Sequence, residues 1–262
     1  MDNLVEVYWF EQSAADVPAA DYWLSPAEAA VVSSMPIPKR RQDWRLGRWT
    51  TKCAIRAYLH PEAFAFGDIE LKLAPSGAPV AFLANAPAPL AISLSHRDGR
   101  ALCSIAPSGV QHGCDLELIE PRSGAFAADY FTDREQADVL QLGPEHRDAA
   151  LTLLWSLKEC VLKALQVGLR ESTLNVKISF PDLASLRHSL AEHIGPSLGN
   201  SWQTAVALTS AGQEFPCRWQ RNRRQLRAVA ASRLFRLLDL SRMQQGDAHV
   251  PRNGLQITLA SG

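Results

Sequence analysis

Two charged segments constrain the fold and the chemistry of this chain more than any other part of its sequence. One segment alternates in the manner of a strand, which places Asp115 and Glu117 on the same face. The other has helical spacing, which places Glu159 and Lys163 on one face because they are four residues apart. Two carboxylates on one strand face repel each other unless a positive charge lies between them. The pattern therefore predicts a strand packed beside a helix at a charged site.

A divalent cation is the natural counter-charge for such a site. Mg²⁺ prefers oxygen ligands and commonly binds through one or two carboxylates together with substrate phosphates. A glutamate on the helix, Glu159, could complete a shell begun by Asp115 and Glu117. The alternative for Glu159 and Lys163 is an exposed ion pair worth roughly a few tenths of a kcal/mol.

Composition narrows the class of protein. The chain has 262 residues, 47% of them hydrophobic, which is enough for one large domain or two small ones. Lys plus Arg and Asp plus Glu both number 27, and this balance argues against a dedicated nucleic-acid binder. No apolar run approaches the ~20 residues of a membrane span, and the first residues lack the basic region of a signal peptide. We therefore expect a cytoplasmic protein that does not bind a membrane.

The cysteines predict neither disulfides nor a zinc site. They are odd in number and widely spaced, with no C-x-x-C pair: Cys53, Cys103, Cys114, Cys160 and Cys217. We expect them to be small core residues.

Periodicity and turn signals predict a mixed set of elements. Helices are expected from the capping box at Ser25 to about Ser33, and over 40–59, 132–141 and 147–165. Strands are expected over 4–10, 68–73, 79–83, 91–94, 101–105, 109–119, 176–180, 202–208, 216–220, 226–231 and 255–259. Residues 84–89 are expected to form a loop.

Two arginine-rich segments need a separate interpretation. The cluster over 218–227 is predicted to be a hairpin with a solvated basic turn, with a nucleic-acid contact as the alternative. The segment containing Arg233 and Arg236 is predicted to be an amphipathic helix packed on the body of the protein.

A short echo divides the chain into two halves. Trp49 and Lys52 repeat the spacing of Trp155 and Lys158, and each pair lies in the longer predicted helix of its half. The match is either a pseudo-repeat or chance, because it covers only a few positions.

Phosphate binding in this chain would rely on side chains. The sequence has no P-loop, no G-x-G-x-x-G turn, no G-x-S-x-G elbow and no H-E-x-x-H helix. A basic stripe runs along the first long helix at helical spacing: Arg41, Arg45, Arg48 and Lys52. Ser95 and His96 end an apolar strand, where a hydroxyl and an imidazole suit phosphate contact. The alternatives are a solvated helix face and an ordinary turn.

Taken in order, these segments resemble the 4'-phosphopantetheinyl transferase superfamily, and within it the long, surfactin-type branch. The matching pieces are residues 77–79, 92–96, 113–117, 131–135, 155–164 and 168–169. The pair of patterns G-x-D-x-E and W-x-x-K-E-x-x-x-K at this separation is highly specific, whereas either alone would be weak. The resemblance extends over roughly residues 40–170.

The resemblance implies an α+β fold built as a pseudo-dimer of two similar lobes. Each lobe would be a small antiparallel sheet packed on a long helix, with one active site in the cleft between the lobes. Residues 1–108 would form the lobe on the side of the coenzyme A adenine and 3'-phosphate. Residues 109–262 would form the lobe with the metal and catalytic motifs. The protein would be a monomer.

The implied activity is transfer of the phosphopantetheine arm of coenzyme A to a serine of an apo acyl, peptidyl or polyketide carrier protein. Adenosine 3',5'-bisphosphate would be released. Asp115, Glu117 and Glu159 would hold Mg²⁺, or Mn²⁺, on the pyrophosphate. Glu159 would help to deprotonate the carrier serine, and Lys163 would stabilise charge on the α-phosphate or the leaving group.

The resemblance also implies a set of coenzyme A-binding residues: Arg41, Arg48, Gly77, Pro79, Ser95, His96, Asp115, Lys158 and Lys163. The chain departs from the family pattern at two positions. Ala78 stands where many relatives carry a basic residue, so the 3'-phosphate would depend more on the helix stripe. Cys114 replaces a β-branched residue before the aspartate, which we interpret as a core substitution.

Two other functions use parts of the same pattern. A Mg²⁺-dependent hydrolase of pyrophosphates or nucleotides would need the same carboxylates but no carrier protein. A non-catalytic module that docks carrier proteins would tolerate charge-neutral changes at Glu159 and Lys163.

Overall fold

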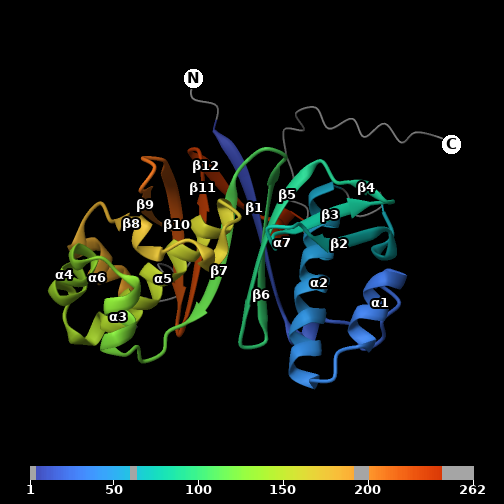
Figure 1. Cartoon of the computed structure of the whole chain (residues 1–262), viewed down its shortest axis with the longest axis horizontal. Helices are drawn as coiled ribbons and strands as arrows, with labels where there is room; N and C mark the ends of the chain where they lie inside the picture. Colours follow the sequence, from blue (N-terminus) through green and yellow to red (C-terminus); the bar gives the residue numbers. More distant parts are fainter. Residues whose placement is uncertain (1–3, 60–63, 192–200, 244–262) are drawn as a thin grey trace.

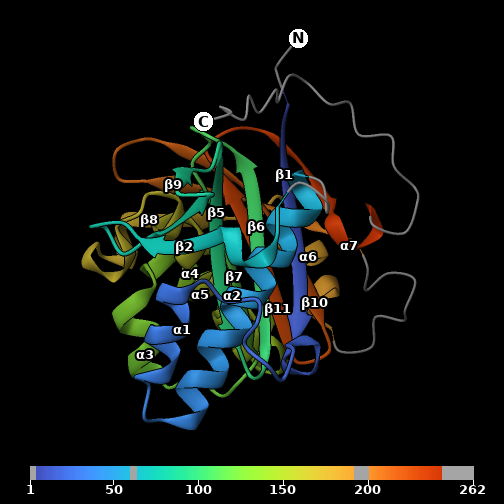
Figure 2. The same cartoon turned by 90° about the vertical axis from the view of Figure 1, so that its right-hand side faces the viewer.

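The structure is a computed structural model that describes residues 4–59, 64–191 and 201–243. Its described part is an α+β fold of two lobes side by side, with strands β1, β5, β6 and β7 running through the middle (Figures 1 and 2). The first lobe is built on a sheet of order β12-β1-β6-β5: Phe235–Asp239, Val5–Ser13, Arg100–Pro107 and Leu90–Arg97. Strands β2, β3 and β4 form a second, smaller sheet in this lobe: Ile69–Leu73, Pro79–Leu83 and Ala86–Pro87. The helices are α1 (Pro26–Ser33) and the long α2 (Pro38–Leu59).

The second lobe repeats this plan. Its sheet has the order β7-β11-β10-β9-β8: His112–Leu118, Gln225–Ala231, Glu214–Asn222, Gln203–Thr209 and Val176–Ser179. The long helix α5 (Arg147–Ala164) packs on it, and shorter helices lie outside: α3 (Gly124–Tyr130), α4 (Asp133–Leu142) and α6 (Leu183–Leu190). The predicted two-lobed α+β fold is confirmed, but the first-lobe sheet is mixed, because β12 pairs in parallel with β1.

The echo of Trp49 and Lys52 corresponds to a repeated internal structure. The Lys52 Nζ lies 2.6 Å from the carboxylate of Glu28, and the Lys158 Nζ lies 2.8 Å from that of Glu135. Both glutamates belong to capping boxes, at the starts of α1 and α4. Both also accept a backbone N–H from the first strand after the long helix, β2 or β8. The same ion pair therefore ties the same three elements together in each lobe.

A separate apolar cluster joins the two lobes. It takes Val7, Leu102 and Ala106 from the first sheet and Cys114, Leu116, Val229 and Ala231 from the second, with Phe235 of β12. Leu116 and Cys114 occupy the face of β7 opposite to Asp115 and Glu117, as the alternation predicts. Burial of this cluster fixes the strand β7 between the lobes, and with it the carboxylates.

The structure corrects several predicted elements. Strand β5 extends to Arg97, so Ser95 and His96 lie within the strand, and the turn falls at Asp98 and Gly99, which both have positive φ. Residues 84–89, predicted as a loop, contain the two-residue strand β4. Helices α3 and α6 were not predicted.

The end of the chain differs most from the prediction. Arg236 lies in strand β12, which pairs in parallel with β1, and not in an amphipathic helix. The edge of β1 offers backbone hydrogen-bond partners to β12, and residues 235–239 pair with it as a strand where a helix could not. Strand β12 and helix α7 (Leu240–Met243) thus contact the first lobe, although they follow residue 109 in the sequence. The predicted strand over 255–259 lies outside the described residues.

Within the described part of the chain, no helix combines the length and the apolar character that a bilayer crossing requires. All five cysteines are free thiols and four of them are buried, which agrees with their predicted place in the core.

Candidate active site

Asp115 is the centre of a charged cluster between β7, β5 and α5. The Lys163 ammonium contacts its Oδ1 at 2.7 Å, and the Ser95 hydroxyl donates to the same oxygen at 2.8 Å. The Ser156 hydroxyl donates to Oδ2 at 2.8 Å. Both oxygens of this buried carboxylate therefore have partners, and Ser95 brings the first lobe to it.

Glu117 lies two residues further along β7 and is held more loosely. The Trp155 indole donates to its Oε1 at 3.2 Å. Its Oε2 is buried and accepts no hydrogen bond, with the guanidinium groups of Arg97 and Arg122 each at 3.8 Å. Burial raises the pKa of Glu117, the charge of Asp115 raises it further, and the two arginines oppose this.

Glu159 is the carboxylate without a partner at its inner oxygen. Its Oε1 is buried and accepts no hydrogen bond from the described residues. Burial raises the pKa of Glu159, the Lys163 ammonium lowers it, and the charges of Asp115 and Glu117 add to the increase. A buried acceptor left unpaired costs free energy, so this position favours a proton or a cation.

The sequence motif on α5 is explained by these contacts. Trp155 holds Glu117, Ser156 and Lys163 hold Asp115, and Glu159 is left free beside them. All the bonded positions lie on the side of α5 that packs against β7. The motif therefore builds one carboxylate cluster from a strand and a helix.

Gly113 allows this packing. A Cβ atom at this position would lie 2.0 Å from the carbonyl oxygen of Cys160, which is backbone of α5 and cannot rotate away. The glycine of the G-x-D-x-E pattern thus permits close approach of β7 to the helix.

We expect Gly113→Ala to lower the free energy of unfolding by about 1–3 kcal/mol or more, because the clash must separate β7 from α5. The contact between Asp115 and Lys163 should be disturbed with it, since the same shift moves Asp115 from Lys163. Denaturant unfolding measures the first effect. Gly67→Ala is the matched control, because a Cβ at Gly67 meets nothing within 4 Å. Equal stability of the two variants would contradict the close-approach argument.

The donor set fits an oxygen-preferring divalent cation. Within this cluster, Glu117 Oε2 and Glu159 Oε1 are buried and have no hydrogen-bond partner, and both carboxylates interact electrostatically with Asp115. Among the described residues, no group of three or more His, Cys, Asp or Glu side chains is already arranged as a metal shell. The reason is visible at Asp115, whose oxygens are used by Lys163, Ser95 and Ser156.

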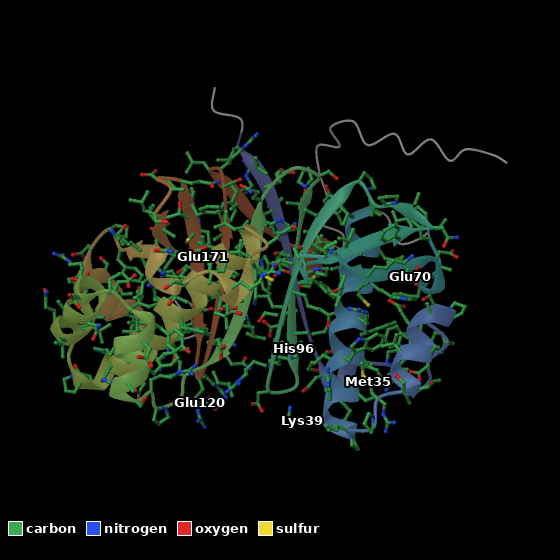
Figure 3. All side chains as sticks on the ribbon, in the orientation of Figure 1. Met35, Lys39, Glu70, His96, Glu120 and Glu171 are labelled. Carbon is green, nitrogen blue, oxygen red and sulfur yellow. The ribbon has the colours of Figure 1, made fainter. Side chains whose placement is uncertain are left out.

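His96 lies on the first-lobe side of the cluster. It is exposed at the end of β5, and its ring approaches α2 near Gly47. Figure 3 labels it near the middle of the molecule, above Lys39 of α2. The turn containing Gly77, which has φ +87°, also reaches the second lobe: Arg170 donates to the Ser76 carbonyl at 2.9 Å. Pro79 follows as the first residue of β3.

The structure places Lys158, which was expected to contact coenzyme A, inside the second lobe. Its side chain is fully buried and bonds to Glu135 and to the Thr173 carbonyl at 2.9 Å. In this structure Lys158 is an internal ion-pair partner, and its contact with coenzyme A stays a prediction.

The basic stripe on α2 is likewise divided. Arg45 bonds to the Pro18 carbonyl at 2.7 Å and to Asp21, and Lys52 is buried. Arg48 is largely buried, 3.6 Å from Glu28 and over the Trp44 ring, with no hydrogen-bond partner at its Nε, so its contact with a phosphate stays a prediction. Of the four, Arg41 is the one exposed on the helix surface.

Sequence reasoning missed several residues of the cluster. Ser156 and the indole of Trp155 lie inside the motif but were given no role. Arg97 follows His96, and Arg122 follows the strand with Glu117, and neither was singled out. In the sequence, these four residues are distinguished only by being close to residues that were assigned to the site.

Fold and cluster together define a two-lobed α+β protein with a carboxylate and lysine site at the junction of its lobes. Residues 111–228 match the family model described as the 4'-phosphopantetheinyl transferase superfamily. Over this stretch, which is a little less than half of the chain, the sequence is similar to this superfamily. The match includes β7 and α5, and so both charged segments.

The chain was also compared with solved structures and with curated proteins. A solved structure, Helicobacter pylori holo-acyl-carrier-protein synthase in complex with coenzyme A, is 19% identical, with a TM-score of 0.30. The similarity covers 39% of this chain and 99% of that chain. No curated protein matches.

Proposed function

We propose that this protein transfers the 4'-phosphopantetheine arm of coenzyme A to a serine of an apo carrier protein and releases adenosine 3',5'-bisphosphate. The observation that carries the proposal is the unpartnered buried oxygen of Glu159 beside Lys163 and Asp115, on the motifs that the family model matches. Two lobes in one chain support the surfactin-type branch.

In the proposed site, Asp115, Glu117 and Glu159 hold a divalent cation, for which we propose Mg²⁺, with Mn²⁺ as a substitute. When bound, the cation neutralises charge on the pyrophosphate of coenzyme A. The unpartnered oxygens of Glu117 and Glu159 support this assignment, because they gain a ligand at no cost to existing hydrogen bonds.

Glu159 receives the proton of the attacking serine. The serine Oγ bonds to the phosphorus that carries pantetheine, the bond from this phosphorus to the bridging oxygen breaks, and the bisphosphate leaves with that oxygen. A raised pKa suits a general base, since proton transfer is most effective when the pKa is close to the working pH.

Lys163 stabilises the charge on the departing phosphate. Burial by itself would lower the pKa of Lys163, but the charge of Asp115 and the hydrogen bond to it raise this pKa above its ordinary value, so the ammonium stays protonated. The Ser95 and Ser156 hydroxyls fix Asp115, which in turn orients Lys163.

We propose that coenzyme A lies between the lobes, in contact with Ser95, His96, Arg41 and the turn from Gly77 to Pro79. The first lobe, approximately 1–108, would bind the adenine side, and the second would carry the metal and catalytic residues. The carrier protein is an acyl, peptidyl or polyketide carrier. We expect a monomeric, cytoplasmic enzyme.

Intact-mass measurement tests the proposal. Purified protein, Mg²⁺ and coenzyme A are incubated with a panel of apo carrier proteins, and each carrier is also supplied with its acceptor serine replaced by alanine. The expected result is a phosphopantetheine mass gain on at least one carrier, absent with EDTA and on the alanine carrier. No gain on any carrier, with no binding of coenzyme A in calorimetry, would refute the proposal.

A further inference from the structure

Two arginines flank Glu117 without forming hydrogen bonds to it. The Arg97 Nε and the Arg122 Nη2 each lie 3.8 Å from Glu117 Oε2. This distance is too long for a hydrogen bond but short enough for strong electrostatic interaction. Arg97 comes from β5 of the first lobe, and Arg122 follows β7 of the second. The carboxylate of Glu117 is thus faced by positive charge from both lobes.

Other groups hold both arginines at this distance. The Arg97 Nη2 contacts the Glu120 carboxylate at 2.5 Å, and Figure 3 labels Glu120 at the lower edge of the second lobe. The Arg122 guanidinium lies 4.8 Å from the Phe126 ring centroid. Its Nε and Nη2 are buried and have no hydrogen-bond partner. Arg122 therefore has unused donors beside the carboxylate cluster.

The side chain of Arg122 is not needed to hold its own loop. The backbone N–H of Arg122 donates to Asp148 at 3.2 Å, and its carbonyl accepts from Arg147 at 2.6 Å. These bonds remain when the guanidinium is removed. Anchoring of the segment after β7 therefore does not explain why the Arg122 side chain has unpaired donors.

We propose that Arg97 and Arg122 couple binding of the divalent cation to binding of a phosphate-bearing ligand. They oppose a bare cation at Glu117, and they donate directly to phosphate oxygens that arrive together with the cation. The inference rests on the proposed function, which places the cation at Glu117 and Glu159.

The balance of charge supports this coupling. The cluster contains three carboxylates, Asp115, Glu117 and Glu159, and they are faced by Lys163, Arg97 and Arg122. Arg97 also pairs with a fourth carboxylate, Glu120, so these groups carry one excess negative charge. A divalent cation alone would turn this into an excess positive charge beside the two arginines. A pyrophosphate group that enters with the cation removes the positive excess and gives the unused donors of Arg122 an acceptor.

Binding of Mn²⁺, followed by the loss of its free-ion EPR signal, tests the inference without a carrier protein. Mn²⁺ is titrated into wild-type protein and into Arg97→Gln and Arg122→Gln, with and without inorganic pyrophosphate as the probe. Each variant should bind Mn²⁺ alone about three- to tenfold more tightly than wild type, because a like charge near the ligand is removed. Pyrophosphate should strengthen Mn²⁺ binding less in the variants than in wild type.

Arg134→Gln is the matched control, because Arg134 is exposed on α4 and pairs with Asp138. Arg122→Lys keeps the charge and should retain the wild-type Mn²⁺ affinity. Unchanged or weaker Mn²⁺ binding in both glutamine variants, or no Mn²⁺ binding by wild type, would overturn the inference. If the wild-type protein transfers phosphopantetheine but the glutamine variants bind Mn²⁺ with unchanged affinity, the coupling is refuted and the proposed function stands. If the variants show the expected Mn²⁺ affinities but the wild-type protein modifies no carrier, the proposed function is refuted and the coupling stands.

Discussion

Replacement of Glu159 by glutamine is expected to reduce phosphopantetheine transfer by a factor of about 10²–10⁴. Glutamine keeps the size of the side chain but can neither accept the serine proton nor supply a charged oxygen to a cation. Glu159 has no hydrogen-bond partner at Oε1, so the substitution breaks no internal bond at that atom. The free energy of unfolding should therefore stay the same or rise slightly.

Single-turnover rates and thermal unfolding separate the two effects. Glu171→Gln is the matched control, because Glu171 is an exposed glutamate beyond the end of α5, labelled in Figure 3 away from His96. We expect the control to transfer at the wild-type rate. A Glu159→Gln protein within threefold of wild type would contradict the role of this carboxylate.

Replacement of Lys158 by methionine should have the largest effect on stability, a loss of about 3–5 kcal/mol in the free energy of unfolding. The Lys158 side chain has no exposed surface, and its removal leaves the buried carboxylate of Glu135 without its counter-charge. Glu135 also caps α4 and accepts the Ile178 backbone N–H at 2.8 Å, so α4, α5 and β8 all lose support.

A double-mutant cycle identifies the cause. Glu135→Gln combined with Lys158→Met should be markedly more stable than the sum of the single changes predicts, because no buried charge remains unpaired. Lys177→Met on the exposed face of β8 is the control and should change stability by less than about 0.5 kcal/mol. If the two substitutions changed the free energy of unfolding additively, the ion pair between Glu135 and Lys158 would not explain the contribution of Lys158 to stability.

Helix geometry explains why Lys163 contacts Asp115, as the motif indicates, whereas Lys158 is buried against Glu135. Residues four apart differ by only about 40° around an α-helix, whereas Lys158 and Lys163 differ by about 140°. The two lysines therefore face different surroundings, although both belong to one motif. Which face is internal depends on the capping glutamate of α4, whose contact with α5 the local pattern does not reveal.

The basic stripe on α2 shows the same limit of local patterns. Its spacing correctly predicted one helical face, but the partners of that face come from distant segments: Glu28 of α1 for Lys52 and Arg48, and the residues before Trp23 for Arg45. A basic side chain that the local pattern would assign to a ligand can instead form an ion pair with a residue far away in the sequence. The same limit applies to β12, which depends on the open edge of β1.

The central strand was predictable in more detail. Alternation in β7 correctly separated Asp115 and Glu117 from Cys114 and Leu116, because one face of the strand meets α5 and the other meets the first lobe. The close approach at Gly113 requires the structure, since a glycine in a strand pattern has several explanations.

The most direct test of the account is the stoichiometry of the reaction. Release of adenosine 3',5'-bisphosphate is measured by chromatography in the same samples in which modification of the carrier serine is measured by intact mass. We predict one bisphosphate for each modified carrier and none when the carrier is omitted. Release without a carrier, at a rate that the carrier does not change, would contradict a transferase and establish a hydrolase of the pyrophosphate bond.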